Sequence, residues 1–115
     1  MKRGDIYWAD LSPRSGSEQK GRRPVIVLSH NAFNQTPTWR SVIVVPVSTS
    51  AAQAKRGPTA IALSKNIGGL TKDSVALCHQ ITTLDRSKLT ERLGALPFRK
   101  LRDIEAGVKA ALDID

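Results

Sequence analysis

The chain has 115 residues, enough for one domain with its own hydrophobic core and too few for two domains of ordinary size. Its 18 lysines and arginines outnumber its 10 aspartates and glutamates, and the formal net charge of +8 favours a polyanionic or acidic partner. One cysteine excludes an internal disulfide, and neither a signal peptide nor a run of 18 apolar residues is present. We therefore expect a cytoplasmic protein without a metal, a cofactor or a membrane contact.

The positive charge is concentrated in the first half of the chain. Residues 1–56 carry nine basic and three acidic side chains, a net of +6, whereas residues 57–115 carry nine and seven, a net of +2. The surface that meets an anion is therefore predicted to lie mainly in the N-terminal half.

The first two predicted strands are residues 6–11, rich in aromatic and β-branched side chains, and residues 25–28, which are wholly apolar. A continuous apolar run of this length is typical of a strand that is buried on both faces. The turn-forming residues between the two strands predict a surface loop, and we expect the strands to pair.

The basic loop before the second strand ends at Arg22, Arg23 and Pro24. Proline restricts the residue before it to extended backbone, so Arg23 is expected to be held at the mouth of the strand. Glu18 is the only acidic residue of this loop, and it could orient an arginine or act as a base. A plain solvated loop has the same composition.

The next strand is predicted at Ser41–Val47, after a polar stretch that favours a helical turn and in which His30 is expected to be a surface residue. Pro46 lacks a ladder donor and favours an edge or a bulge near the end of this strand. A hydroxyl cluster follows at residues 48–50. Such clusters are often turn caps, so position relative to Arg23 decides their role.

The remaining predicted elements are short strands at residues 59–63, 74–78 and 90–96, arranged as a meander, and a C-terminal helix. Residues 79–84 continue or follow the strand at 74–78, and Pro97 suits the first helical position. The helix has an apolar stripe formed by Leu101, Ile104, Val108, Ala111 and Leu112. The fold class is thus mainly β with α: about six or seven short, mostly antiparallel strands in a small barrel or half-open sheet.

Four segments together resemble the MazF/PemK family of toxin endoribonucleases: KRGDIYWADLSP, GSEQKGRRPVIVLS, PVSTS and DSVALCHQITTLDRSKL. The resemblance covers nearly the whole chain and implies a single toxin domain, residues 1–115, with an SH3-like barrel and a C-terminal helix. It further implies a homodimer that cleaves single-stranded RNA, such as mRNA, without a metal ion. The implied partner is a cognate antitoxin whose acidic disordered tail blocks the RNA groove. A homodimer is also expected because one helix can cover only one apolar face of the sheet.

The resemblance places the catalytic arginine at Arg23 and the catalytic hydroxyl at Ser48, where relatives have threonine. Thr49 is the alternative if the register differs by one residue. Glu18 matches the glutamate of the GSEQ motif, and His79 stands where many relatives have a carboxylate. The predicted RNA contacts are Gln19, Lys20, Arg22, Thr49, Ser50, Lys55, Arg56 and Gln80.

The implied reaction is attack by a ribose 2′-OH, which yields a 2′,3′-cyclic phosphate and a 5′-OH. It needs a base, an acid and charge stabilisation at the phosphorus, and the planar guanidinium of Arg23 suits the last of these. An arginine rarely gives up its proton, so Glu18 or His79 is the expected base or acid. Both also have structural interpretations, Glu18 as a tether for an arginine and His79 as a satisfied residue on a strand face.

Two other functions are compatible with the same fold. A non-enzymatic toxin could bind and poison DNA gyrase, but such relatives carry an aromatic near the C-terminus, where this chain ends in Leu-Asp-Ile-Asp. A plain RNA-binding barrel would rely on stacking aromatics, and this chain has only five aromatic residues, two of them, Tyr7 and Trp8, within a predicted strand. The endoribonuclease is therefore the leading hypothesis, with no prediction of the RNA sequence that it recognises.

Overall fold

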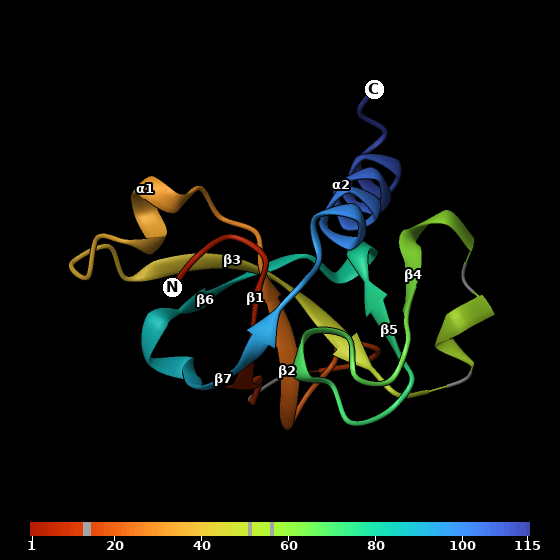
Figure 1. The fold of residues 1–115 in the computed structure, drawn as a ribbon, viewed down its shortest axis with the longest axis horizontal. Coiled ribbons are helices and arrows are strands. Elements are labelled where there is room, and N and C mark those ends of the chain that lie inside the picture. The colour runs from red at the N-terminus through yellow and green to blue at the C-terminus, as the bar shows by residue number, and fades with distance from the viewer. Residues whose placement is uncertain (13–14, 51, 56) are drawn as a thin grey trace.

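The computed structural model describes residues 1–12, 15–50, 52–55 and 57–115 (Figure 1). Within these residues the chain forms seven strands: β1 (Asp5–Asp10), β2 (Arg22–Val27), β3 (Ser41–Ser48), β4 (Ala60–Leu63), β5 (Ser74–Leu77), β6 (Thr82–Asp85) and β7 (Leu89–Ala95). The helices are α1 (Asn31–Asn34) and α2 (Phe98–Leu112). The 3-10 turns are η1 (Gln53–Lys55), η2 (Gly57–Thr59), η3 (Ile67–Gly69), η4 (Cys78–Gln80) and η5 (Arg86–Lys88).

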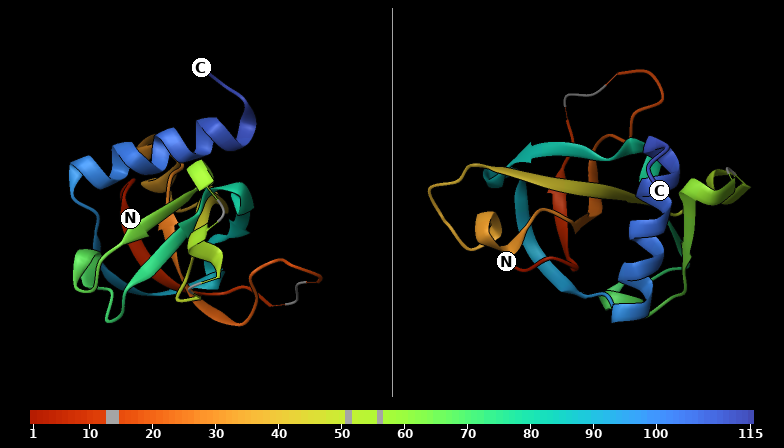
Figure 2. Two further views of the ribbon diagram at one scale, coloured as in Figure 1. Left: turned by 90° about the vertical axis from the view of Figure 1, so that its right-hand side faces the viewer. Right: turned by 90° about the horizontal axis from the view of Figure 1, so that it is seen from above.

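The strands form one curled antiparallel sheet in the order β4-β5-β3-β2-β1-β7, and β6 also pairs with β3 (Figure 2). This confirms the predicted fold class, with the qualification that the barrel-like sheet is not closed. The predicted pairing of the first two strands is confirmed as well, with Ala9 opposite Arg23. The predicted meander holds for β4 and β5, which pair as antiparallel neighbours, but it does not continue to β7, which returns to β1.

Pro46 does not mark a sheet edge, since β3 lies in the middle of the sheet. Along one side of β3, residues 41–44 pair with β6, whereas Val47 and Ser48 pair with β5. Pro46 lies where the partner on that side changes from one strand to the other. The ladder is interrupted at this point, which is a position where a proline without an N–H is tolerated in a central strand.

Both faces of the central strands are buried in hydrophobic clusters. The cluster under α2 contains Ile6, Ile26, Val45, Val47 and Ile104, among others. The cluster on the opposite face, enclosed by the curl of the sheet, contains Ala9, Leu11, Val25, Val42, Val44 and Leu84. The burial of β2 on both faces agrees with its continuous apolar sequence. The sheet covers its own second face, so the expectation of an uncovered face that needs a partner is wrong.

Helix α2 begins after Pro97, which is the N-cap and not the first helical residue. Its apolar stripe ends earlier than predicted, since Leu112 is 53% exposed. The closest packing is at Gly107, where an added Cβ would lie 2.7 Å from Cys78 Sγ. Glycine therefore lets the helix approach η4, and burial raises the pKa of the Cys78 thiol to about 11.

The turn η3 packs against β7 through glycines. Gly69 has φ of +82°, and a Cβ there would overlap the Leu93 carbonyl. A Cβ at Gly94 would lie 2.7 Å from the Gly68 oxygen. These glycines allow the backbones of η3 and β7 to approach closely.

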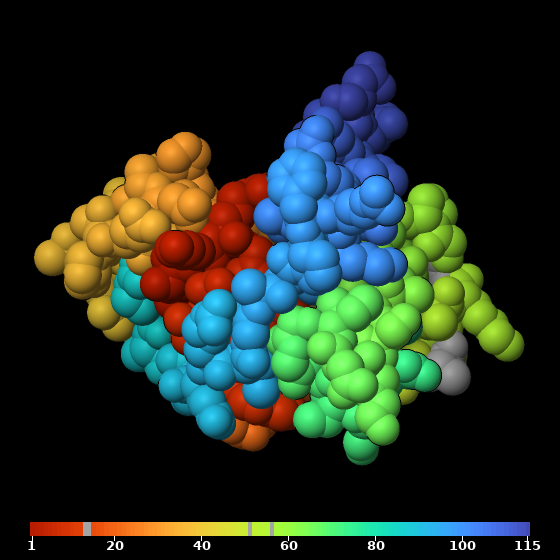
Figure 3. Space-filling view, in the orientation of Figure 1, coloured from red at the N-terminus to blue at the C-terminus, as the bar shows by residue number. Residues whose placement is uncertain are grey.

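The space-filling view shows the segment around α1 projecting on one side of the molecule, apart from α2 (Figure 3). No helix in the described part of the chain is long and apolar enough to cross a membrane.

Candidate active site

Arg23 and Ser48 lie at the same end of the sheet, where β2 begins and β3 ends. These strands are antiparallel, with Val25 opposite Pro46. Extended by two residues beyond these pairs, the same register sets the backbone of Arg23 across from that of Ser48. Arg23 itself pairs with Ala9 of β1, and Ser48 with Val75 of β5, so the two residues flank one end of the sheet.

The Arg23 side chain is exposed and is held by the loop that precedes it. Its Nε donates a hydrogen bond to the Lys20 carbonyl at 3.2 Å. Pro24 fixes the backbone from the other side. Because Nε is used by the loop, the two terminal nitrogens are the ones that a phosphate would meet.

Ser48 caps the turn at the end of β3. Only 5% of the residue is exposed, and its Oγ accepts a hydrogen bond from the Ser50 N–H at 3.1 Å. This contact uses the oxygen as an acceptor and leaves the hydroxyl proton for donation. Turn capping and donation of a hydrogen bond to a phosphate are therefore compatible roles for this hydroxyl.

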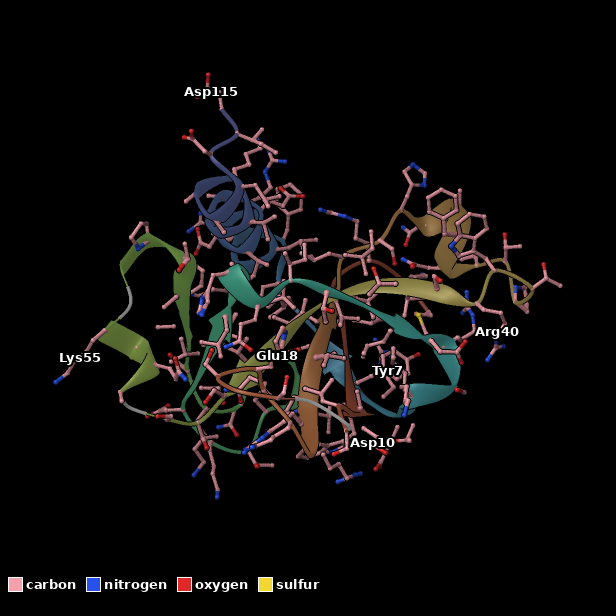
Figure 4. The ribbon with its side chains drawn as sticks, turned by 180° about the vertical axis from the view of Figure 1, so that it is seen from behind. Tyr7, Asp10, Glu18, Arg40, Lys55 and Asp115 are labelled. Atoms are coloured by element: carbon pink, nitrogen blue, oxygen red, sulfur yellow. The ribbon has the colours of Figure 1, made fainter. Side chains whose placement is uncertain are left out.

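Glu18 lies on the loop between β1 and β2 (Figure 4), which is tied to the β5–β6 connection by Gln80. The Gln80 Oε1 accepts from the Gln19 N–H at 2.8 Å, and its Nε2 donates to the Ser17 carbonyl at 3.1 Å. These two bonds lie on either side of Glu18. Gln80, predicted as an RNA contact, thus fixes the loop that carries the predicted base.

Glu18 lines a hollow of about 350 Å³ together with Asp10 and Lys88. One of its oxygens, Oε1, accepts a hydrogen bond from Ser15 Oγ at 3.3 Å. Arg23 does not line this hollow. His79 is exposed on η4, next to Gln80, and not on the strand face that the structural interpretation assumed.

A second pocket, of about 260 Å³, opens beside Arg23. Among its lining residues are three cations and three hydroxyls: Arg22, Arg23, Lys72, Thr49, Thr71 and Ser74. Its apolar lining includes Trp8, Val47, Leu70 and Leu93. Within the described part of the chain none of the lining residues is acidic, so the pocket is suited to a ligand that carries negative charge.

Arg22 lies over Trp8 at the wall of this pocket. Its Cζ is 4.3 Å from the centroid of the Trp8 ring, and its Nη2 is 3.6 Å from Glu91 Oε2. Sequence reasoning missed Trp8 and Lys72 as site residues. The signal for Trp8 was the alternation of side chains along a strand, which places Trp8 on the same face as Ile6 and on the other face from Ala9. No comparable signal identified Lys72.

The other predicted RNA contacts are more dispersed. Gln19 and Lys20 belong to the tethered loop, and Ser50 is exposed just beyond β3. Lys55 ends η1 and projects outward on the side of β4 (Figure 4). Arg56 lies outside the described residues.

Comparison with known proteins identifies the family. A family model described as "PemK-like, MazF-like toxin of type II toxin-antitoxin system" matches residues 2–112. The chain belongs to this toxin family. The MazF-like toxin is 37% identical over 114 residues to an endoribonuclease MazF of Staphylococcus saprophyticus, a match that covers 99% of this chain and 92% of that protein. The resemblance inferred from the sequence motifs is confirmed.

Solved structures agree with this assignment. The fold is similar to MazF from Deinococcus radiodurans, with a TM-score of 0.81, 29% identity, and coverage of 99% of this chain and 97% of that chain. It is also similar to the chain matched in a MazE-MazF structure from the same organism, with a TM-score of 0.76, 28% identity, and coverage of 100% and 97%.

Proposed function

We propose that this MazF-like toxin is an endoribonuclease that cleaves single-stranded RNA, with its reaction centre where β2 begins and β3 ends. The observation that carries the proposal is that Arg23, near the start of β2, and Ser48, at the end of β3, share one end of the sheet, with the Arg23 Nε held by the Lys20 carbonyl. The 37% identical relative that is named an endoribonuclease supports the same function.

In the proposed reaction the ribose 2′-oxygen attacks the adjacent phosphorus, and the bond from phosphorus to the 5′-oxygen breaks. The 2′-OH proton passes to a base, and the leaving 5′-oxygen takes a proton from an acid. The products are a 2′,3′-cyclic phosphate and a 5′-OH. No metal enters this scheme, because the developing charge on the phosphoryl oxygens is met by Arg23 and the Ser48 hydroxyl. Donors fixed in advance at such a charge are commonly the largest catalytic contribution.

Proton transfer is assigned to Glu18 and His79. Arg23 is unsuited to it, because a guanidinium remains protonated at neutral pH. The two assigned residues lie on separate segments that the Gln80 side chain ties together. This shared tether supports their assignment to one reaction centre.

The proposal includes the partners and the location of the toxin. We propose a homodimer that acts in the cytoplasm and is neutralised by a cognate antitoxin with an acidic disordered segment. The net charge of +8 supports an acidic partner. The Deinococcus radiodurans MazF with a similar fold was solved together with MazE.

The test is incubation of the purified toxin with mixed single-stranded RNA in excess EDTA. We expect discrete fragments with 2′,3′-cyclic phosphate ends. Arg23→Lys keeps the charge but loses the bidentate fork, so cleavage should fall about 10²-fold or more. Arg99→Lys, at an exposed position on α2, is the matched control and should cleave normally.

Two results would contradict the proposal. Normal cleavage by Arg23→Lys would remove Arg23 from the reaction centre. Intact RNA together with stalled DNA gyrase would replace the endoribonuclease with the gyrase-binding alternative.

A further inference from the structure

The pocket beside Arg23 has a lining that a phosphate alone does not require. A phosphate site needs cations and hydrogen-bond donors, and Arg22, Arg23 and Lys72 supply the charge. The same pocket is also lined by the Trp8 indole, together with Val47, Leu70 and Leu93. Apolar and aromatic surface beside a cationic rim matches the two parts of a nucleotide, its base and its phosphate.

We propose that this pocket is a nucleobase subsite, in which a base next to the scissile phosphate stacks on Trp8. The inference rests on the proposed function, because RNA must already lie at Arg23. Arg23 is the shared wall, because it is assigned to the reaction centre and also lines the pocket. A strand that passes from one to the other places a phosphate at the arginine and the neighbouring base against the indole.

Arg22 now occupies the face of Trp8 and must give way to the base. Its contacts are weak ones, because the Arg22 and Glu91 side chains are 57% and 70% exposed and their ion pair is 3.6 Å long. An exposed cation–π contact adds less than a base–aromatic stack does. Replacement of Arg22 by a base on the Trp8 ring is therefore favourable, and the displaced Arg22 guanidinium becomes available to a phosphate.

The polar groups of the pocket provide the means of choosing a base. The Ser74 hydroxyl already donates to the Lys72 carbonyl at 2.8 Å. Thr49, Thr71 and the Lys72 ammonium are the groups that can meet the edge of a stacked base. Thr49 thus has a role in base binding, distinct from that of its neighbour Ser48.

A stacked aromatic pair elsewhere is the competing platform. Phe33 and Trp39 have ring centroids 4.6 Å apart with an interplanar angle of 18°, and they are 41% and 47% exposed. The nearby Arg40 is paired with Asp85 at 3.1 Å. Since cations that can meet a phosphate line the Trp8 pocket, the observations favour Trp8.

The experiment uses tryptophan fluorescence. The chain has two tryptophans, so Trp39→Phe leaves Trp8 as the only emitter. The probe is a short mixed-sequence RNA that is 2′-O-methylated throughout and therefore cannot be cleaved by 2′-OH attack. We expect saturable quenching of Trp8 by this RNA and none by an abasic strand of the same length and charge. Trp8→Leu should weaken binding about 10-fold or more, whereas Trp8→Phe keeps a ring and most of the affinity.

Two outcomes would overturn the subsite. One is equal quenching by the abasic strand, which would indicate a phosphate pocket only. The other is quenching seen only from Trp39, in the Trp8→Phe variant, which would assign base stacking to the Phe33 and Trp39 pair. Cleavage of natural RNA is measured separately on the unsubstituted toxin. Base-dependent quenching without any cleavage would keep the subsite and contradict the proposed function. Cleavage without quenching would keep the proposed function and contradict the subsite.

Discussion

Two adjacent hydroxyl residues of this toxin lie at the end of β3 in different surroundings. Ser48 is the last residue of β3 and is buried, whereas Thr49 lies beyond the strand and lines the pocket with Trp8 and Arg23. Single variants of the two residues therefore separate their proposed roles.

We expect Ser48→Ala to lower the cleavage rate more than Thr49→Ala, by about 10- to 100-fold against wild type, because a hydroxyl donor to the phosphate is lost. Ser48→Thr keeps the hydroxyl and is the matched control. Ser48→Ala also loses the bond from the Ser50 N–H, so denaturant unfolding should show a loss of about 1 kcal/mol. A larger rate loss in Thr49→Ala would transfer the hydroxyl role to Thr49.

His79 gives a second prediction for a single residue, through the pH dependence of cleavage. An imidazole that transfers a proton bends the rate profile between about pH 5 and 8. His79→Ala should remove this bend and lower the rate about 10²-fold. His79→Asp, the kind of residue that many relatives have, should restore part of the rate and bend the profile at lower pH. An unchanged rate and profile in His79→Ala would leave Glu18 as the proton-transfer residue.

The sequence predicted the identity of single residues better than their contacts. Pro24 was sufficient to place Arg23 at the start of a strand, because proline acts on its immediate neighbour. The contacts of Gln80 with Ser17 and Gln19 span more than 60 positions, and no local pattern encodes them. Trp8 was interpreted only as a strand residue, although the side chain of a strand residue can also line a pocket.

At the scale of elements, the tether between η4 and the loop before β2 gives a direct prediction. Gln80→Met has a similar length but cannot form either hydrogen bond, so the loop that carries Glu18 should loosen. Hydrogen exchange at the Gln19 amide should become faster, and cleavage should fall about 10-fold through kcat, because the loop is no longer fixed in place. Gln53→Met, on η1, is the control. Slower cleavage with an unchanged Gln19 amide would instead indicate that Gln80 contacts RNA.

Asp85 links β6 to η5 and to the start of β3, and its contacts predict a pH dependence of stability. Hydrogen bonds from the Ser87 hydroxyl and N–H, and then from Arg40, lower the pKa of Asp85 to about 2. A carboxyl whose folded pKa lies below its unfolded value near 3.8 stabilises the fold above about pH 4, and this contribution is lost as the pH falls toward 2.

The Tm of Asp85→Asn should therefore lie below that of wild type at pH 5 to 7, and the difference should shrink between about pH 4 and 2. Thermal scans across this range measure it. Asp113→Asn is the control, since Asp113 has φ of +56° at the end of α2 and asparagine accepts that backbone. A Tm difference for Asp85→Asn that stays constant down to pH 2 would contradict the assigned cause.

Element types followed from local sequence, whereas element pairing did not. The apolar run of β2 and the period of α2 were sufficient to identify both elements. Pro46 indicated an edge because a proline shows only that a donor is missing, not which side of the strand lacks it. Pairing of β3 with two different strands on one side satisfies the same requirement inside the sheet. Glycines at seams, such as Gly94 and Gly107, gave no sequence signal because their reason is a neighbour far along the chain.

For the whole molecule, the exposed apolar surface suited to a homodimer does not lie on the second face of the sheet. The second face of the sheet is filled by the cluster around Val25 and Val44, so it does not need a partner. Large apolar side chains are instead exposed at the start of β3, where Trp39 is 47% and Ile43 is 41% exposed. Arg86 holds this loop through hydrogen bonds to the carbonyls of Phe33, Asn34, Thr36 and Trp39. A rigid, exposed aromatic is typical of an interface anchor.

We expect sedimentation at micromolar concentration to give the mass of two chains, with the start of β3 at a two-fold interface. Trp39→Lys should then give monomers, because the same charge enters the interface twice. Phe98→Lys is the matched control: Phe98 is 73% exposed at the beginning of α2, remote in sequence from the loop, and its replacement should leave the dimer intact. A wild-type monomer would contradict the homodimer. Dissociation by Phe98→Lys but not by Trp39→Lys would keep the dimer and move its interface to α2.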